Sequence, residues 1–293
     1  MTFNEGARLD SSRVRTSRGG RGVAVGGGLG VLALVVLSQL LGIDLTALGD
    51  GLSQGSATSE ATSAVEGCET GADANQDVSC RVVGALNSLD AYWAQALPAA
   101  GKEFVQPGAE IFEVSVQTGC GNATSAVGPF YCPADQSMYI DTGFYDDLRT
   151  RFGSSGGPLA EMYVVAHEYG HHIEQITGLM DQADRTGTGP GSDSVRIELT
   201  ADCLAGMWAR NASTVPDPVS GVPFLQPLTP EEIADALSAA AAVGDDRIQE
   251  QATGTVSPEA WTHGSSEQRQ QWFLVGFEGG TLDDCNALAA ESL

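Results

Sequence analysis

The chain has 293 residues, with 14 basic against 38 acidic side chains, so its formal net charge at pH 7 is −24. This length allows one large domain or two small ones with a sizeable hydrophobic core. A surface this acidic repels phosphate backbones, so the composition argues against a nucleic-acid partner.

The N-terminal region consists of a basic stretch followed by an apolar one. Residues 1–21 contain several arginines and indicate a disordered basic tail, and residues 22–43 carry no charge. About 20 helical residues span a bilayer core, so we expect one transmembrane helix at 22–43. Basic residues precede it and acidic residues follow it, which places the tail in the cytoplasm and the rest outside. A signal peptide cleaved near residues 47–49 is the alternative, although its apolar part is usually only about 7 to 15 residues.

A flexible stalk and one folded domain should follow this segment. Residues 44–79 are rich in Gly, Ser, Thr, Ala and Asp and contain few large apolar residues. Such a composition does not bury a core. We therefore expect a stalk over 44–79 and a folded domain over 80–293.

All six cysteines follow the apolar segment, and none of them forms a Cys-x-x-Cys pair. An even number of cysteines in an extracytoplasmic body indicates disulfide bonds rather than a cysteine zinc site. The spacing favours Cys68–Cys80 and Cys120–Cys132, which leaves Cys203–Cys285.

Within the domain, the patterns predict mostly helices with a small sheet, which is an α+β fold. Alternating residues predict a strand over 110–117, and a Pro-Ala-Asp turn inside 130–141 predicts two short strands there. Apolar residues at helical spacing, with capping signals, predict helices over 81–97, 156–178, 192–210, 228–244 and 263–280.

Three of the four histidines lie in the stretch AHEYGHHIEQITG, inside one predicted helix. His167 and His171 are four residues apart, so both imidazoles lie on one helix face and can bind one Zn²⁺ ion. Glu168 lies beside the first ligand and can act as general base on a water that the metal activates. His172 lies about 100° around the helix from His171, so we expect it to pack or hydrogen-bond instead of binding the metal. Gly170 lowers helix stability by about 1 kcal/mol relative to alanine, which predicts a close neighbour there.

A catalytic zinc site needs a third protein ligand and an open position. In the next predicted helix, Glu198 and Asp202 lie one turn apart among apolar residues, where two carboxylates are costly without partners. We predict that Glu198 is the third ligand and that Asp202 holds a ligating histidine through its other ring nitrogen. A solvated acidic helix face is the alternative interpretation.

His263 is the one histidine outside this stretch. A zinc peptidase needs a group besides the metal to stabilise the oxyanion of the tetrahedral intermediate. His263 is our candidate for this role, with Tyr163 and Tyr139 as alternatives. A purely structural histidine fits the sequence equally well.

Four motifs in this order resemble those of the bacterial "putative neutral zinc metallopeptidase" family: CGNATSAVGPFYCPADQSMYID, HEYGHHIE, ELTADCLAG and THGSSEQRQQWF. The pattern His-Glu-x-x-His followed by Glu-x-x-x-Asp is also similar to the gluzincin arrangement. This resemblance implies a zincin-like domain in which two histidines and one glutamate bind zinc and a second glutamate is the base. Carried over to this chain, the ligands are His167, His171 and Glu198, the base is Glu168, and Asp202 supports a ligand.

The resemblance also implies features beyond the metal ligands. Members often carry an N-terminal membrane segment, and gluzincin-like folds bind the substrate backbone along an edge strand, for which SMYID (137–141) is the candidate. The polar loop at 180–192 matches no motif of the family, so its role stays open.

Together these features predict a membrane-anchored, zinc-dependent endopeptidase with an extracytoplasmic domain that acts on peptide or protein substrates. One alternative is a catalytically silent, zinc-stabilised binding module, and another is a structural cell-envelope domain without metal. The ligand histidines must be neutral to bind zinc, so the affinity should fall below about pH 6.5.

Overall fold

The computed structural model describes residues 2–18 and 63–293, and at its centre lies a mixed sheet. Five of the described strands form this sheet in the order β2-β1-β3-β7-β6. Strands β1, β3 and β7 run parallel, whereas β2 and β6 pair antiparallel at the two edges. In sheet order the strands are Ser63–Ala64, Val14–Arg18, Gly108–Glu113, Ser137–Asp141 and Phe130–Cys132.

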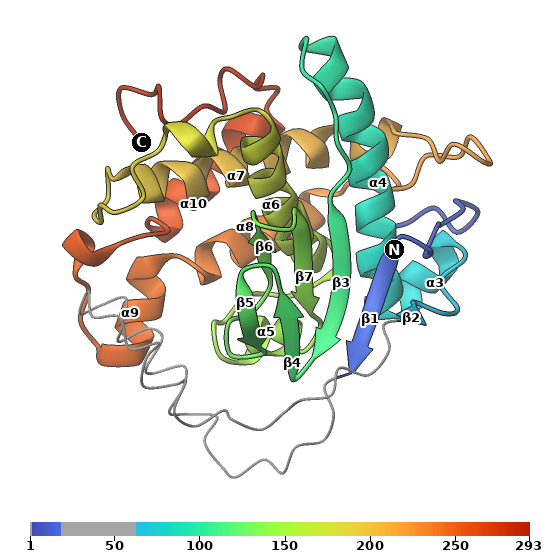
Figure 1. Ribbon diagram of the computed structural model, residues 1–293, viewed down its shortest axis with the longest axis horizontal. Coiled ribbons are helices and arrows are strands. Elements are labelled where there is room, and N and C mark those ends of the chain that lie inside the picture. Colours follow the sequence, from blue (N-terminus) through green and yellow to red (C-terminus); the bar gives the residue numbers. More distant parts are fainter. Residues whose placement is uncertain (1, 19–62) are drawn as a thin grey trace.

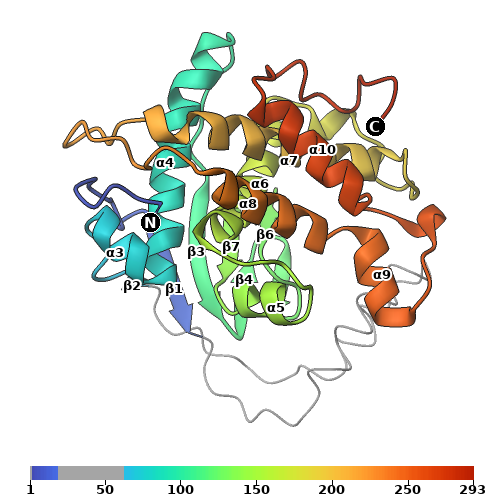
Figure 2. The same cartoon turned by 180° about the vertical axis from the view of Figure 1, so that it is seen from behind.

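Helices cover one face of this sheet. Figure 1 looks onto the strands, and Figure 2, from behind, shows α8 and α10 in front of them. Helix α6 packs against α4, α7 and α8, and α10 packs against α7. This is the α+β arrangement that the sequence predicted. The helices are α3 (Gly71–Gln76), α4 (Val78–Ala99), α5 (Phe144–Thr150), α6 (Pro158–Ile176), α7 (Asp193–Asn211), α8 (Pro230–Ala242), α9 (Asp245–Thr253) and α10 (Ser266–Phe277).

Local signals place the predicted helices within a few residues of their observed ends. The Ser192 hydroxyl accepts a hydrogen bond from the Val195 N–H at the start of α7, and capping boxes begin α8 and α10. The predicted strand over 110–117 is instead broken at Val114, whose φ of 70° is left-handed. The chain after this break forms β4 (Ser115–Thr118), which pairs with β5 (Gly121–Thr124) in a separate hairpin.

The N-terminal segment is part of the folded domain, and the prediction of a disordered tail over 1–21 is wrong for residues 2–18. Strand β1 pairs with β3 along its whole length (Figure 1). Phe3 is fully buried beside Gly84 of α4, where a side chain would collide with the phenyl ring. The guanidinium of Arg13 donates to both carboxylate oxygens of Asp90, at 2.5 and 2.8 Å. Arg13 suggested a solvated tail because its acidic partner, Asp90, lies far along the chain.

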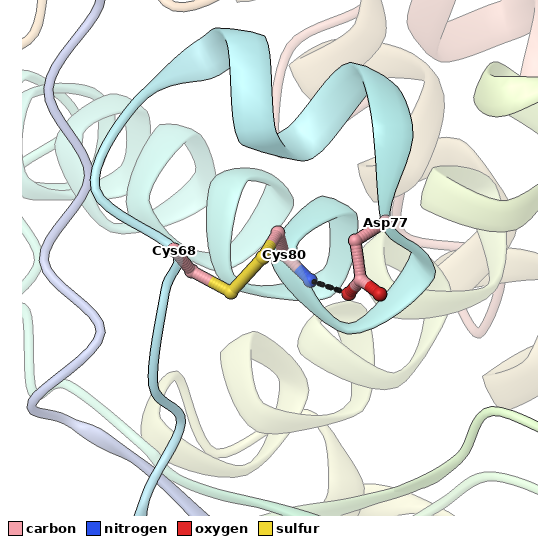
Figure 3. A group of neighbouring side chains, drawn as sticks. All are labelled: Cys68, Asp77 and Cys80. Carbon is pink, nitrogen blue, oxygen red and sulfur yellow. Dashed lines mark hydrogen bonds between the residues drawn. A yellow bond between two sulfur atoms is a disulfide. The ribbon is translucent and has the colours of Figure 1, made fainter.

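The domain also begins earlier than the predicted boundary at residue 80. Val65, Cys68 and Ala74 are buried, so the described part of the predicted stalk, residues 63–79, belongs to the core. Figure 3 shows how Cys68 and Cys80 join this part to α4 through a disulfide, next to Asp77. The Asp77 carboxylate accepts a hydrogen bond of 3.0 Å from the Cys80 N–H and caps α4. Cys68, Asp77 and Cys80 lie close enough together to resemble a metal site. Because the two sulfurs are bonded to each other, this cluster of three residues does not bind a metal ion.

All three predicted disulfides are confirmed. Besides Cys68–Cys80, the structure contains Cys120–Cys132 and Cys203–Cys285, and none of the six cysteines is free. The last bridge ties α7 to the C-terminal segment, so it braces the helix that carries Glu198 and Asp202.

The predicted membrane helix at 22–43 lies outside the described residues and stays a prediction. Within residues 2–18 and 63–293, no helix combines the length and apolar character that a bilayer crossing requires. The sequence analysis placed the tail and the domain on opposite sides of a membrane, and this placement does not agree with the pairing of β1 and β2. In this pairing Thr16 lies opposite Ser63. A single crossing between these strands would separate them by a hydrocarbon core of about 30 Å.

We expect Phe3→Ala to destabilise the domain although it changes a residue of the predicted tail. Removing a buried phenyl ring costs about 3–5 kcal/mol of unfolding free energy. The matched control is Glu5→Ala, since Glu5 is exposed in the same segment and should change the unfolding free energy by about 0.5 kcal/mol or less. Urea unfolding of both variants tests this expectation. Equal midpoints for wild type and Phe3→Ala would show that residues 2–18 do not pack in solution.

Candidate active site

Helices α6 and α7 approach each other closely enough to bring their polar side chains together. A Cβ atom at Gly170 of α6 would lie 2.8 Å from the Cα atom of Ala201 on α7, so only glycine permits this contact. This is the close neighbour that the sequence predicted at Gly170. Helix α6 carries His167, Glu168 and His171 into the contact, and α7 carries Glu198 and Asp202.

His167, His171 and Glu198 form a compact group of potential metal ligands. One ligand atom from each residue lies within 4.8 Å of the other two, and all three side chains are largely buried. Oε2 of Glu198 lies 3.2 Å from Nε2 of His167 and 3.7 Å from Nε2 of His171. Ligands at about 2.0–2.2 Å from a tetrahedral zinc ion are roughly 3.3 Å apart, so these donors fit zinc.

Each histidine is held through its other ring nitrogen by a buried carboxylate. Oδ1 of Asp202 lies 2.9 Å from Nδ1 of His167, and Oε2 of Glu174 lies 2.8 Å from Nδ1 of His171. Both Nε2 atoms are thereby left to face Glu198. Asp202 lies where the sequence analysis placed it, whereas Glu174 was missed. Its signal was its position three residues after His171, on the same helix face.

Arg269 on α10 is a second residue that the sequence analysis missed. Its guanidinium donates to both oxygens of Asp202, at 2.8 and 3.0 Å, and lies 3.2 Å from the Tyr163 hydroxyl. The Tyr163 hydroxyl in turn donates to Asp202. Tyr163 is therefore committed to the support of Asp202 and is not available as the oxyanion donor. Helix α10 reaches this place because Gly276 lets it lie directly on α7.

His263 lies in the loop between α9 and α10 and lines the same cavity as the three ligands. Asp245 at the start of α9 holds it. One oxygen of Asp245 accepts from the backbone N–H of His263 at 2.7 Å, and the other lies 3.3 Å from Nδ1 of the ring. The side chain of His263 is 41% exposed, so the ring is accessible from the cavity. Asp245 was not predicted, because only the folded loop brings it next to His263.

The structure places two other residues named in the sequence analysis, Tyr139 and His172, away from the ligands. Tyr139 donates to Asp135 at 2.7 Å and belongs to a separate small core around Phe112, so it is not an oxyanion donor. His172 packs away from the metal ligands, as expected. Its Nε2 lies 2.6 Å from the Val105 carbonyl oxygen.

The segment SMYID is not an edge strand, which corrects the prediction drawn from the family resemblance. It forms β7, which has β3 on one side and β6 on the other. The edge strand is β6, and two of its residues, Phe130 and Tyr131, line the cavity together with His167 and Glu168.

The cavity has a volume of about 440 Å³ and a largely apolar wall. Phe144, the first residue of α5, and Phe152, two residues after its end, contribute to this wall and pack against each other with ring centroids 6.1 Å apart. Met180 and Arg185 come from the loop 180–192, whose role the sequence left open. The cavity therefore places an apolar surface beside the histidines and carboxylates.

A family comparison agrees with this geometry. The family model described as "Putative neutral zinc metallopeptidase" matches residues 4–288. The chain belongs to this family. Because the match begins at residue 4, the family pattern includes the N-terminal segment that contains β1.

The chain is also similar to proteins of other bacteria. The chain is 54% identical to "Uncharacterized protein Rv2575" of Mycobacterium tuberculosis over 226 residues, 77% of this chain and 76% of that protein. It is 37% identical to "Uncharacterized protein YpfJ" of Escherichia coli K12 over 268 residues, 89% of this chain and 86% of that protein. No solved structure matches the chain.

The electrostatics of this family member suit a site that exchanges protons for a cation. Burial of the His171 ring lowers its pKa, but Glu198 and Glu174 more than offset this and hold the pKa well above its ordinary value. Burial raises the pKa of Glu198, but His171 and His263 outweigh this and hold it well below its ordinary range. Burial also raises the pKa of Glu168, and His167 and His171 only partly oppose this effect.

We expect zinc binding at pH 7 to release protons. The pKa of His171 is raised, so the metal-free site holds a proton there that zinc must displace. As the pH is lowered, the zinc affinity should therefore begin to fall while the pH is still above about 6.5, the ordinary pKa of a free histidine. Calorimetric titration with zinc in buffers of different ionisation enthalpy, from about pH 6 to 8, measures both effects.

The metal-free protein should show the matching dependence of stability on pH. A raised pKa in the folded state stabilises the protein below the ordinary pKa, and this contribution is lost as the pH rises through the folded value. The unfolding free energy of the metal-free chain should thus decrease as the pH rises through the pKa of His171. Zinc binding without proton release at pH 7 would contradict the raised pKa.

Proposed function

We propose that this protein is a zinc-dependent endopeptidase. The observation that carries the proposal is the convergence of His167, His171 and Glu198 beside the carboxylate of Glu168 in a cavity with an apolar wall. Membership of the neutral zinc metallopeptidase family supports the same reaction class.

The three ligands would hold the ion, which supplies Lewis acidity toward the peptide carbonyl and lowers the pKa of water. Glu168 then takes the proton from the attacking water and gives it to the leaving amine. Its buried position supports both steps, because a raised pKa makes the carboxylate a stronger base and leaves its acid able to donate near neutral pH. Asp202 and Glu174 keep the Nδ1 protons of the histidines in place, so Nε2 faces the ion.

His263 is the group that we assign to the oxyanion of the tetrahedral intermediate. Its Nδ1 lies 3.0 Å from the Thr262 hydroxyl and 3.3 Å from Asp245, and its backbone N–H donates to Asp245, so Nε2 is the ring atom left for the substrate. The nearby carboxylates of Glu198 and Asp245 outweigh burial and raise the pKa of this ring, which favours a donating imidazole. The arrangement meets the need for a fixed donor where negative charge develops.

Strand β6 is the element that we assign to substrate binding. It is the free edge of the sheet on the cavity side, and an extended peptide can add to such an edge through main-chain hydrogen bonds. The apolar wall formed by Phe130, Phe144 and Phe152 then provides contacts for substrate side chains.

The decisive experiment measures the metal content and the proteolysis of the full chain together. Protein purified without an affinity tag should contain one zinc ion per chain and cleave an unfolded protein substrate. A chelator should abolish the cleavage, and added zinc should restore it. Zinc without cleavage of any unfolded protein or peptide library would favour the silent binding module, and the absence of zinc would refute the proposal.

His263→Ala should lower kcat with little change in KM, because the imidazole acts on charge that appears only in the transition state. Loss of one oxyanion donor lowers kcat by about 10²–10³-fold. Asp245→Asn, which keeps the backbone hydrogen bonds but weakens the hold on the ring, should give a smaller loss. Steady-state kinetics on one peptide substrate measures all three proteins. A normal kcat in His263→Ala would remove His263 from the mechanism.

Association with a membrane through residues 22–43 is a separate proposal. The three disulfides support an oxidising compartment for the domain. Because β1 pairs with β2 and β3, we place residues 2–18 in the same compartment. A cysteine introduced at Glu5 should therefore react with a membrane-impermeant maleimide from the same side as the domain. Labelling from the cytoplasmic side alone would contradict this placement.

A further inference from the structure

Glu174 is a carboxylate in an unusual position. It lies on α6 and is fully buried, with no exposed surface. One oxygen, Oε2, lies 2.8 Å from Nδ1 of His171. The other oxygen, Oε1, has no hydrogen-bond partner within the described residues. A buried carboxylate with half of its acceptors unused is costly, so its presence needs a specific reason.

Asp202, the carboxylate that holds the other histidine, is in a different electrostatic situation. Arg269 donates to both of its oxygens, and the Tyr163 hydroxyl donates to one of them. The charges of Asp202 and Arg269 therefore cancel as a pair. In the described part of the chain, the only ion pair of Glu174 is the one with His171. Its negative charge is uncompensated whenever that ring is neutral.

These contacts define the charge around the three ligands. A divalent ion brings two positive charges, and Glu198 is the only ligand of the three that carries a negative charge. Asp202 contributes none in sum, because Arg269 neutralises it. Glu168 makes no hydrogen bond to either histidine among the described contacts, and its carboxylate is assigned to proton transfer. Glu174 is the remaining carboxylate that acts on a ligand directly.

We propose that Glu174 is the positioning residue of His171 and supplies the second negative charge that balances a divalent ion at this site. The inference rests on the zinc site of the proposed function and extends it. The hydrogen bond fixes the ring with Nε2 toward Glu198, and the uncompensated charge strengthens the binding of His171 to the cation.

Two substitutions separate orientation from charge. Glu174→Gln keeps an oxygen that can accept from Nδ1 of His171 but removes the negative charge. Glu174→Ala removes both. The control is Asp141→Asn, because Asp141 is also a buried carboxylate but caps the backbone N–H of Gly143 away from the ligands. The full chain is used in all cases, with zinc affinity measured by competition with a chromophoric chelator.

We expect Glu174→Gln to weaken zinc binding by about 10-fold and Glu174→Ala by about 100-fold, the range found for partners of metal-ligating histidines. Asp141→Asn should leave the affinity unchanged. At a pH high enough to leave His171 neutral without zinc, the unfolding midpoint of the metal-free Glu174→Gln protein should stay within about 4 °C of wild type, since the charge then serves the ion and not the fold. This second readout distinguishes the proposal from a purely structural role.

The opposite pattern would overturn the inference. If Glu174→Gln and Glu174→Ala bind zinc as tightly as wild type while their metal-free forms melt at lower temperature, Glu174 only supports the fold. If Glu174→Gln binds zinc normally and Glu174→Ala does not, orientation alone is needed and the charge balance is refuted. If the wild-type chain itself binds no zinc, the proposed function fails first, and the two failures are distinguished.

Discussion

The variant Glu168→Gln should bind zinc as the wild type does and should lose almost all hydrolytic activity. The glutamine side chain would occupy the same buried volume on α6, and Glu168 is not one of the three clustered donors. The amide does not accept a proton from water, so the step that needs a general base has no acceptor. Removal of a general base lowers the rate by about 10²–10⁴-fold.

Single-turnover cleavage of a fluorogenic peptide, with the zinc content measured on the same sample, gives the required comparison. Glu267→Gln is the matched control, because Glu267 is an exposed glutamate at the start of α10, and its activity should equal that of wild type. Full activity in Glu168→Gln with zinc bound would exclude Glu168 as the base. Loss of zinc together with activity would instead assign Glu168 to the metal ligands.

The parts of the site that lie within one helix were accessible from the sequence. His167, Glu168 and His171 are adjacent on α6, and their relative positions follow from helical geometry alone. Glu198 and Asp202 required one further inference. Two carboxylates among the apolar residues of one helix are costly without partners, so both were assigned to the histidines and their metal ion. Glu174 obeys the same local geometry and could have been predicted from its spacing to His171.

Residues that act across elements were not accessible in this way. Arg269 meets Asp202 only because glycines let α10 lie on α7, and Asp245 meets His263 only through the loop between α9 and α10. No local pattern marks either pair. For the same reason the edge strand was misassigned. The Pro-Ala-Asp turn predicts that 130–141 forms two strands, but only the long-range pairing of β7 with β3 leaves β6 at the edge.

The N-terminal segment shows how composition can mislead. Its arginines and small polar residues are typical of disorder when they are considered alone. In the structure, a strand of five residues and one buried phenylalanine attach this segment to a domain with an excess of acidic side chains. Composition alone does not decide whether this segment is ordered, because its order depends on a partner surface formed by residues far along the chain.

Replacement of Glu198 should have the largest effect on metal binding. Apparent binding free energies of about 10–16 kcal/mol are typical of structural zinc sites with four protein ligands. Loss of one of three ligands here should therefore cost about 3–4 kcal/mol, or about 10²–10³-fold in affinity. Glu198→Ala should lose both zinc and hydrolysis, whereas Asp181→Ala, which removes an exposed carboxylate, should keep both. Chelator competition measures the affinities.

The loss in Glu198→Ala is expected to be specific to the metal, since the residue has no arginine partner in the described structure. Its described contacts are the two histidine rings, and its charge lowers the cost of the proton that His171 holds without zinc. The metal-free variant should thus lose stability mainly below the raised pKa of His171 and less above it. Wild-type zinc affinity in Glu198→Ala would mean that the two histidines bind the ion without this carboxylate. A different third ligand would then have to be found in the cavity.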